Sequence, residues 1–159
     1  MRVKGVAVVL AACVCALGLA MASPARRAAP SRSVVARGEY LVNAVAGCGH
    51  CHTPRKGEAL DKTRWLAGGT EFKSPTGTNY SRNLTPDRET GLGKWTEKQF
   101  VQAMRKGLSP DRGELMPPMP LYDRITSPDL HAMWSYLRTV KPIRNKVPAR
   151  QPAQEQPGA

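Results

Sequence analysis

The spacing of hydrophobic and polar residues changes along the chain, and each pattern predicts a different element. Residues 6–21 form an unbroken apolar run of 16, whereas residues 23–33 are mostly Pro, Arg, Ala and Ser and predict a flexible lead-in. Further on, apolar side chains return near one face of a helix, at Val34, Leu41 and Val45. This spacing predicts a helix of about three turns that runs into residues 47–55.

Two further helices are predicted in the second half of the chain. Residues 96–99 form a capping box, and Gly107 ends the helix that they begin. Its apolar face comprises Phe100, Val101 and Met104. Ser127 is expected to cap the last helix, with Pro128 in its first turn and Pro142 beyond its end. The buried stripe of that helix comprises Leu130, Met133, Trp134 and Leu137.

The segments between these helices show no helical period. Residues 55–82 are rich in Gly, Thr, Lys and Ser, residues 83–95 are a cluster of turn formers, and residues 108–125 hold four prolines. No strand pattern is evident, so the sequence predicts a small all-α fold with long loops. The last residues, 149–159, are expected to form a disordered tail.

The first 22 residues have the charged, apolar and small-residue order of a secretory signal peptide. Arg2 and Lys4 precede the apolar run, and residues 20–22 (Ala-Met-Ala) form a small-x-small cleavage site. An uncleaved membrane anchor and lipidation at Cys13 are the alternatives. The run is shorter than the roughly 20 residues that a membrane span needs, and it continues well beyond Cys13. We therefore expect export with cleavage after Ala22.

Tightly spaced cysteines and a histidine follow the first predicted helix, in Cys48-Gly49-His50-Cys51-His52. A disulfide or a redox-active dithiol would suit the spacing but would not use His52, and the dithiol would need a preceding strand. Zinc needs four ligands, and no second cysteine pair or His-x3-5-His follows. In C-x-x-C-H the thiols form thioethers with haem, and the histidine ligates its iron. We therefore expect one covalently bound haem c at Cys48 and Cys51, with His52 as an axial ligand.

A second axial ligand is expected from a methionine or a histidine outside the signal. Met104 and Met133 fit the apolar stripes of their helices, and His131 neighbours the second of these stripes. Met116 and Met119 lie instead in a proline-rich, non-helical segment that can hold a thioether over a flat ring. A thioether ligand favours ferrous iron and raises the reduction potential. One of these two methionines is the expected ligand.

These motifs resemble the class I-like c-type cytochromes, and most closely the haem domains of cytochrome subunits of membrane-bound alcohol dehydrogenases. The resemblance covers residues from about 35 to 148 and rests on four segments: GEYLVNAVAGCGHCHTPR, NLTPDRETGLGKW, MPPMP and YLRTVKPIRNKVP. It implies a fold whose N- and C-terminal helices cross beside one haem. Gly38 would allow the close approach, and the side chains expected to meet there are Tyr40, Leu41, Trp134 and Leu137. The resemblance also implies that Met119 ligates iron, while Trp95 either borders the haem or belongs to the core.

The expected role is that of an electron carrier and not of an enzyme. A haem enzyme or a gas-binding sensor with a labile distal ligand is the alternative. The resemblance implies redox partners: a periplasmic or membrane-bound dehydrogenase as donor, and an oxidase or another cytochrome as acceptor. The chain has 24 Lys and Arg against 12 Asp and Glu, a formal charge of +12, and loss of Arg2 and Lys4 with the signal leaves +10.

This charge predicts an acidic partner surface or an anionic membrane, unless it belongs to solvated tails. A nucleic-acid role is not expected, because the chain is predicted to be exported and carries no binding motif. The expected location is the periplasm, with membrane anchoring as the alternative.

Overall fold

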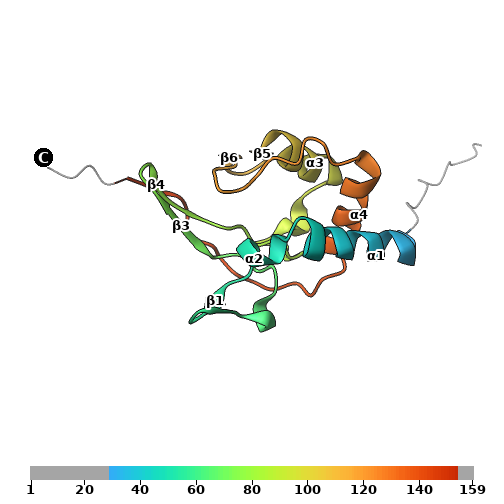
Figure 1. Ribbon diagram of the computed structural model, residues 1–159, viewed down its shortest axis with the longest axis horizontal. Coiled ribbons are helices and arrows are strands. Elements are labelled where there is room, and N and C mark those ends of the chain that lie inside the picture. The colour runs from blue at the N-terminus through green and yellow to red at the C-terminus, as the bar shows by residue number, and fades with distance from the viewer. Residues whose placement is uncertain (1–28, 154–159) are drawn as a thin grey trace, which may run out of the picture.

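The computed structural model describes residues 29–153, so the expected signal peptide lies outside the described residues. The first helix, α1 (Arg32–Tyr40), continues as a π-helical turn, η1 (Leu41–Val45), and then as the short helix α2 (Cys48–His52) (Figure 1). The helix predicted to run into the cysteine motif is therefore present. Within the described range, no helix combines the length and the apolar character that crossing a membrane requires.

Short strands occupy several of the segments that were predicted to be irregular. They are β1 (Arg55–Lys56), β2 (Ala59–Leu60), β3 (Glu71–Ser74), β4 (Gly77–Tyr80), β5 (Leu108–Ser109), β6 (Gly113–Glu114) and β7 (Gln151–Pro152). The expectation of a purely α-helical fold is therefore wrong for the described residues. These strands are two to four residues long and mostly exposed, so their folding does not require the alternating pattern by which strands are found in a sequence.

The end of the described chain returns to the body of the molecule. Strands β3 and β4 pair in antiparallel fashion, and β7 joins the other edge of β4. Gln151 of β7 lies opposite Thr78, and Pro152 lies opposite Gly77. Part of the segment expected to be a disordered tail is thus a paired strand here, while residues 154–159 lie outside the described range.

The third helix begins and ends where the sequence predicts. A short 3-10 turn, η3 (Leu92–Lys94), precedes α3 (Glu97–Lys106). The Gln99 N–H donates to Thr96 Oγ1 at 3.3 Å, and the Thr96 N–H donates to Gln99 Oε1 at 2.8 Å, which completes the capping box. Gly107 ends the helix in the left-handed conformation, with φ of 67°.

The last helix, α4 (Ser127–Leu137), begins one residue earlier than predicted. Its cap is Thr126, whose Oγ1 accepts a hydrogen bond from the Asp129 N–H at 3.2 Å. The prediction of Ser127 as the cap is therefore wrong. Ser127 is the first helical residue, and its hydroxyl oxygen accepts instead from an Arg105 Nη2–H at 3.0 Å.

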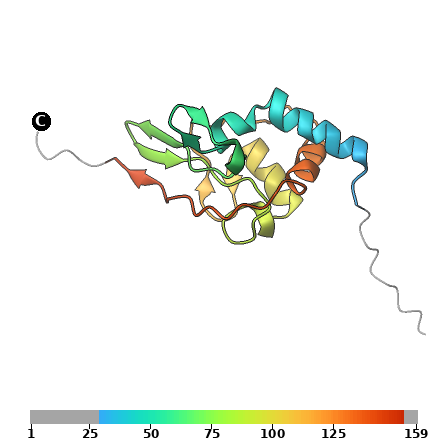
Figure 2. The ribbon, with the colours of Figure 1, turned by 90° about the horizontal axis from the view of Figure 1, so that it is seen from below.

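Helices α1 and α4 cross in close contact (Figure 2). Gly38 permits this approach, because a Cβ atom at that position would lie 1.9 Å from the carbonyl oxygen of Ala132. Arg37 and Asp129 form an ion pair beside the crossing, with Nε 2.9 Å from Oδ1. The predicted crossing is present, but Tyr40 is 56% exposed and does not join its buried contacts.

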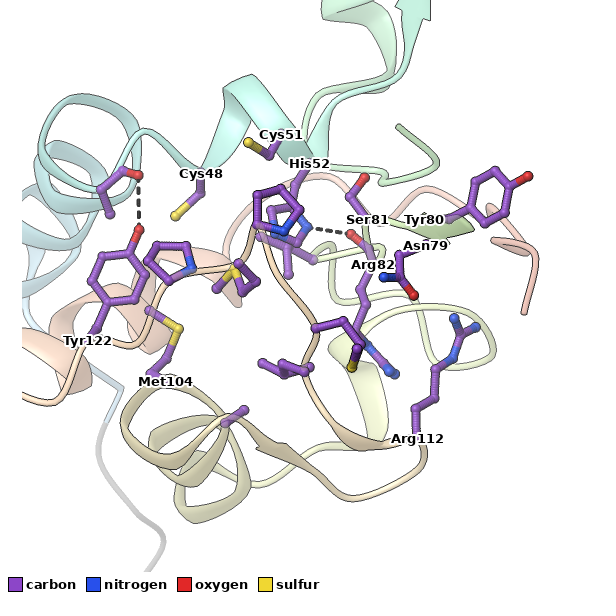
Figure 3. A pocket seen from close by; sticks show the side chains of 18 of the residues that line it. Cys48, Cys51, His52, Asn79, Tyr80, Ser81, Arg82, Met104, Arg112 and Tyr122 are labelled. Atoms are coloured by element: carbon purple, nitrogen blue, oxygen red, sulfur yellow. Dashed lines mark hydrogen bonds between the residues drawn. The ribbon is translucent and has the colours of Figure 1, made fainter. Parts of the chain in front are cut away.

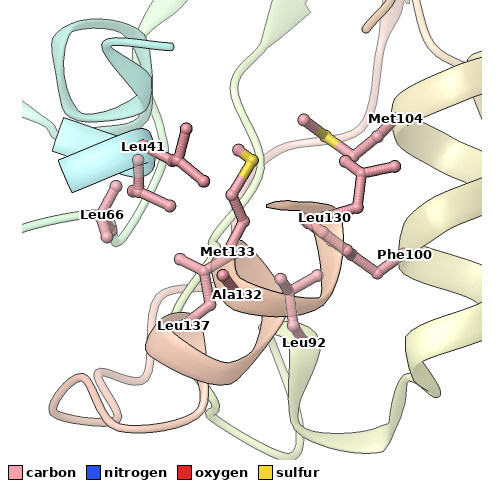
Figure 4. Close-up of a cluster of buried hydrophobic side chains, with 10 residues drawn as sticks. Leu41, Leu66, Leu92, Phe100, Met104, Leu130, Ala132, Met133 and Leu137 are labelled. Carbon is pink, nitrogen blue, oxygen red and sulfur yellow. The ribbon is translucent and has the colours of Figure 1, made fainter. Parts of the chain in front are cut away.

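One hydrophobic core fills the space between the helices and the 66–92 loops (Figure 4). The buried residues of this cluster are Leu41, Val42, Leu66, Leu92, Phe100, Met104, Leu130, Ala132, Met133 and Leu137. Most of the predicted apolar positions of α3 and α4 are among them. Trp134 is only partly buried and packs against the cluster, with its ring centroid 5.5 Å from that of Phe100.

Candidate functional site

The cysteine motif forms the short helix α2, which begins after a left-handed glycine. Gly47 has φ of 58°, a backbone conformation that side chains disfavour, and it turns the chain from η1 into α2. Within α2 the two cysteines are three positions apart, so they lie near the same face of the helix. Cys48 is half-buried and Cys51 is exposed, while His52 follows as the last residue of the helix. Two thiols and one imidazole are therefore presented together.

His52 is held in one orientation by a backbone carbonyl. Its side chain is buried, and Nδ1 lies 2.7 Å from the carbonyl oxygen of Arg82. A carbonyl oxygen only accepts hydrogen bonds, so Nδ1 carries the proton and Nε2 keeps a free lone pair. Burial lowers the pKa of His52 below its ordinary value, although the hydrogen bond to Arg82 opposes this shift. The neutral imidazole is thus ready to ligate a metal through Nε2.

The Cys48 thiol does not have the thiolate character of a redox-active or zinc-binding cysteine. Burial, with a smaller effect of Cys51, raises the pKa of Cys48 to about 11. A free thiol with this pKa stays protonated at neutral pH, whereas reactive or metal-binding cysteines are thiolates. The two cysteines are not joined by a disulfide. Among residues 29–153, no group of three or more His, Cys, Asp or Glu side chains is arranged to hold a metal ion.

A cavity of about 590 Å³ opens beside α2 (Figure 3). Cys48, Cys51 and His52 line one part of its wall, and the apolar side chains of α3 and α4 line another. Arg82 and Arg112 lie at the end of the cavity away from Cys48. The wall draws on residues from 46 to 150, so segments far apart in the sequence contribute to it.

Methionine sulfurs are available on the cavity wall. The lining residues of this type are Met104, Met116, Met119 and Met133. Met104 and Met133 are members of the buried core, Met119 packs against that core, and Met116 is not part of it. The sulfur of Met116 lies 3.9 Å from Arg150 Nη1. The preference for Met119 over Met116 as an iron ligand therefore stays a prediction.

Tyr122 fixes the segment that carries Met119, and sequence reasoning missed this role. The Tyr122 N–H donates to the carbonyl oxygen of Met104 on α3 at 2.8 Å. Its hydroxyl donates to the carbonyl oxygen of Ala46, just before α2, at 3.2 Å. The position of Tyr122 directly after Met119-Pro120-Leu121 was the available signal.

Of the other residues considered as haem contacts, one lies outside the cavity and one lines it. His131 does not line the cavity, and its Nδ1 lies 2.8 Å from Glu97 Oε1 on α3. Trp95 does line the cavity, with the guanidinium carbon of Arg82 5.3 Å from its ring centroid.

Comparison with known proteins adds independent information. The cytochrome c subunit of the quinone-dependent alcohol dehydrogenase of Gluconobacter oxydans is 39% identical over 121 residues, covering 73% of this chain and 24% of the subunit. The fructose dehydrogenase cytochrome subunit of Gluconobacter japonicus is 39% identical over 128 residues, covering 78% of this chain and 25% of the subunit.

The chain is a relative of c-type cytochrome subunits. A nicotinate dehydrogenase subunit of Pseudomonas putida is also similar, with 38% identity over 123 residues, which are 76% of this chain and 10% of that protein. The chain thus spans about a quarter or less of the length of these relatives. No family model matches it. The resemblance to the cytochrome subunits of dehydrogenases that the sequence motifs indicated is confirmed.

The residues of this cytochrome-like cavity fit a haem c. The C-x-x-C-H helix presents both thiols, His52 offers an unprotonated nitrogen, and thioether sulfurs are present on the same cavity. The apolar wall suits a macrocycle, and a volume of about 590 Å³ is within the range of cofactor pockets. Arginines at one end complement the carboxylates that a haem carries.

Proposed function

We propose that this chain is a single-haem c-type cytochrome that carries one electron between redox partners outside the cytoplasm. The observation that supports it best is the convergence of Cys48, Cys51, His52 and methionine sulfurs on one largely apolar cavity. The similarity to cytochrome c subunits of dehydrogenases supports the same role. One C-x-x-C-H motif in the sequence supports one haem per chain.

Each of these residues has a defined task in the proposal. Haem c, when bound, would supply an iron that takes up and releases one electron. Cys48 and Cys51 would hold the macrocycle through thioether bonds, and His52 would ligate the iron through Nε2. The Arg82 carbonyl keeps the imidazole in the required tautomer and orientation. Met119 would bind the iron through its thioether sulfur and favour the ferrous state.

The rest of the cavity keeps the site dry and rigid. Phe100, Leu92, Met104 and Leu137 belong both to the core and to the cavity wall, so the wall cannot change shape without disturbing the core. An apolar wall also excludes water and raises the cost of charging the iron, which supports a higher reduction potential. Both effects suit an electron carrier.

The proposed partners and location follow from the relatives and the charge. The names of two relatives associate them with alcohol and fructose dehydrogenases, so a periplasmic or membrane-bound dehydrogenase is the proposed donor. An oxidase or another cytochrome is the proposed acceptor. The excess of basic residues supports docking to an acidic surface or to an anionic membrane.

Two properties of the exported protein test the proposal: whether the haem is covalently attached, and whether the iron lacks a free coordination position. Protein exported in a strain able to mature c-type cytochromes should keep haem after denaturing electrophoresis, and Cys48→Ala or Cys51→Ala should lower the yield of haem-bearing protein. The reduced wild type should not bind carbon monoxide. A haem-free polypeptide on the gel would overturn the proposal. Covalent haem combined with rapid carbon monoxide binding would favour a haem enzyme or a gas-binding module instead.

A further inference from the structure

Three arginines line the cavity: Arg82, Arg112 and Arg150. Arg82 and Arg112 lie at the end away from Cys48, which we call the arginine end. Figure 3 shows Arg82 and Arg112 on the far side of the cavity from Cys48. The three are linked: Arg82 pairs with Asp111, which precedes Arg112, and Arg112 Nη1–H donates to the carbonyl oxygen of Pro148, two residues before Arg150.

Arg82 is fixed in place but has an unused donor. Its guanidinium lies over Trp95, and Nη2 donates to an oxygen of Asp111. Its Nη1 is buried and has no hydrogen-bond partner. Two other side-chain atoms of the described residues share this condition, Asn43 Oδ1 and Arg105 Nε, and neither residue lines the cavity. Because a buried, unpaired guanidinium N–H costs free energy, an additional acceptor beside Arg82, which lines the cavity, would lower this cost.

The other two arginines point to an anionic acceptor. Arg112 and Arg150 use backbone carbonyls as partners, with Arg112 Nη2–H 3.4 Å from the oxygen of Val147 and Arg150 Nη2–H 3.2 Å from that of Thr76. Burial, followed by the positive charge of Arg82, lowers the pKa of Arg112 below its ordinary value. Asp111 and Glu114 are the nearby acids, so positive charge remains in excess at this end.

We infer that Arg82, together with Arg112 and Arg150, binds the two propionate carboxylates of the haem and raises the reduction potential of the haem. The inference rests on the proposed function. In haem, the two vinyl-derived carbons and the two propionates lie on opposite sides of the macrocycle. A haem attached at Cys48 and Cys51 therefore directs its carboxylates toward the arginine end. Guanidinium groups bind carboxylates through charge-assisted hydrogen bonds.

This arrangement has an electrostatic consequence. Ferric haem carries one more positive charge than ferrous haem, so a nearby guanidinium disfavours the ferric state. Removing one guanidinium should therefore stabilise the ferric state and lower the reduction potential. The C-terminal segment acquires a function as well, because it brings Arg150 to the cavity.

The test compares haem-bearing Arg82→Gln, Arg112→Gln and Arg150→Gln with the wild type. The matched control is Arg138→Gln: Arg138 also lies over a tryptophan, with its guanidinium carbon 5.4 Å from the Trp134 ring centroid, but it does not line the cavity. We expect Arg82→Gln to raise the ferric-to-ferrous ratio at a fixed potential about tenfold, which is 59 mV for a one-electron couple. The resonance Raman bands of propionate bending should shift in this variant and stay unchanged in Arg138→Gln. Arg82→Lys, which keeps the charge, should restore most of the potential.

Three results would overturn the inference. Covalent haem with wild-type potentials and unshifted propionate bands in all three arginine variants would remove these residues from the site while leaving the proposed function intact. If Arg82→Gln yields no haem-bearing protein, the Arg112→Gln and Arg150→Gln variants decide: a lowered potential in either variant supports the inference, and wild-type values in both contradict it. A wild type without covalent haem would overturn the proposed function and this inference together.

Discussion

Replacing Gly38 with alanine tests the crossing of α1 and α4 directly. The added Cβ would lie 1.9 Å from the Ala132 oxygen, 2.5 Å from its carbonyl carbon and 2.8 Å from Tyr136 Cβ. Two of these atoms are backbone, so a rotamer change cannot remove the clash. To reach an ordinary contact distance of 3.4 Å, the helices must move apart by about 1.5 Å at this point.

The cost can be estimated from two opposing effects. Overpacking of a well-packed site typically costs about 1–3 kcal/mol, and the buried neighbours Ala132 and Met133 would lose contacts when the helices separate. Alanine in a helix interior recovers about 1 kcal/mol relative to glycine. Taking the upper part of the overpacking range because backbone is involved, we expect Gly38→Ala to lower the free energy of unfolding by about 2 kcal/mol. The midpoint of thermal unfolding should fall by about 8 °C.

The measurement is thermal and guanidinium unfolding of the haem-bearing protein, followed by far-ultraviolet circular dichroism. Ala36→Gly, at an exposed position of α1, is the control, because it changes helix propensity in the opposite direction without a clash. It should cost about 1 kcal/mol. If helix propensity alone governed position 38, Gly38→Ala would be more stable than the wild type. A midpoint at or above that of the wild type would refute the close crossing.

Three further outcomes are expected. Met119→Ala should let the reduced protein bind carbon monoxide and should abolish the weak long-wavelength band of a sulfur-ligated ferric haem, whereas Met116→Ala should keep that band; the reverse result would exchange their roles. The hydrogen bond from Arg37 holds the pKa of Asp129 below its ordinary 3.8. This stabilisation is present above that value and is lost as pH falls through the folded-state pKa. The difference in free energy of unfolding between wild type and Arg37→Gln should therefore close in acid. A difference that stays constant with pH would contradict a role of this ion pair in stability. Electron exchange with an acidic partner should slow as salt rises, and a salt-independent rate would exclude steering by the basic residues.

The helices of this protein could be predicted because their signals are local. The capping box at Thr96, the left-handed Gly107 and the apolar stripe ending at Leu137 each act within one or two turns of helix. The shift of the α4 cap from Ser127 to Thr126 shows the limit of this approach. Two adjacent hydroxyl residues both satisfy the pattern, and the Ser127 hydroxyl instead accepts from Arg105, which lies 22 positions away in the chain.

The cavity could be predicted only in part, because its wall is assembled from distant segments. The spacing of the C-x-x-C-H motif alone predicts covalent haem attachment. By contrast, Arg82 appears in the sequence as one basic residue among many, and Arg150 as a charge in a tail. Their positions depend on long-range contacts, such as the pairing of β7 with β4, that leave no periodic signal. The short strands were missed because two to four mostly exposed residues carry no alternating pattern.

The cavity wall draws on residues from 46 to 150, and this has a consequence for the order of assembly. Cys48 and Cys51 leave the ribosome well before α4 and the segment that carries Arg150. The thiols are thus available before the segments that form the opposite wall of the cavity are present. A bulky, rigid group attached at that stage meets no closed cavity that it would have to enter. The remaining chain can then fold around it, so that folding, and not diffusion through an opening, encloses the group.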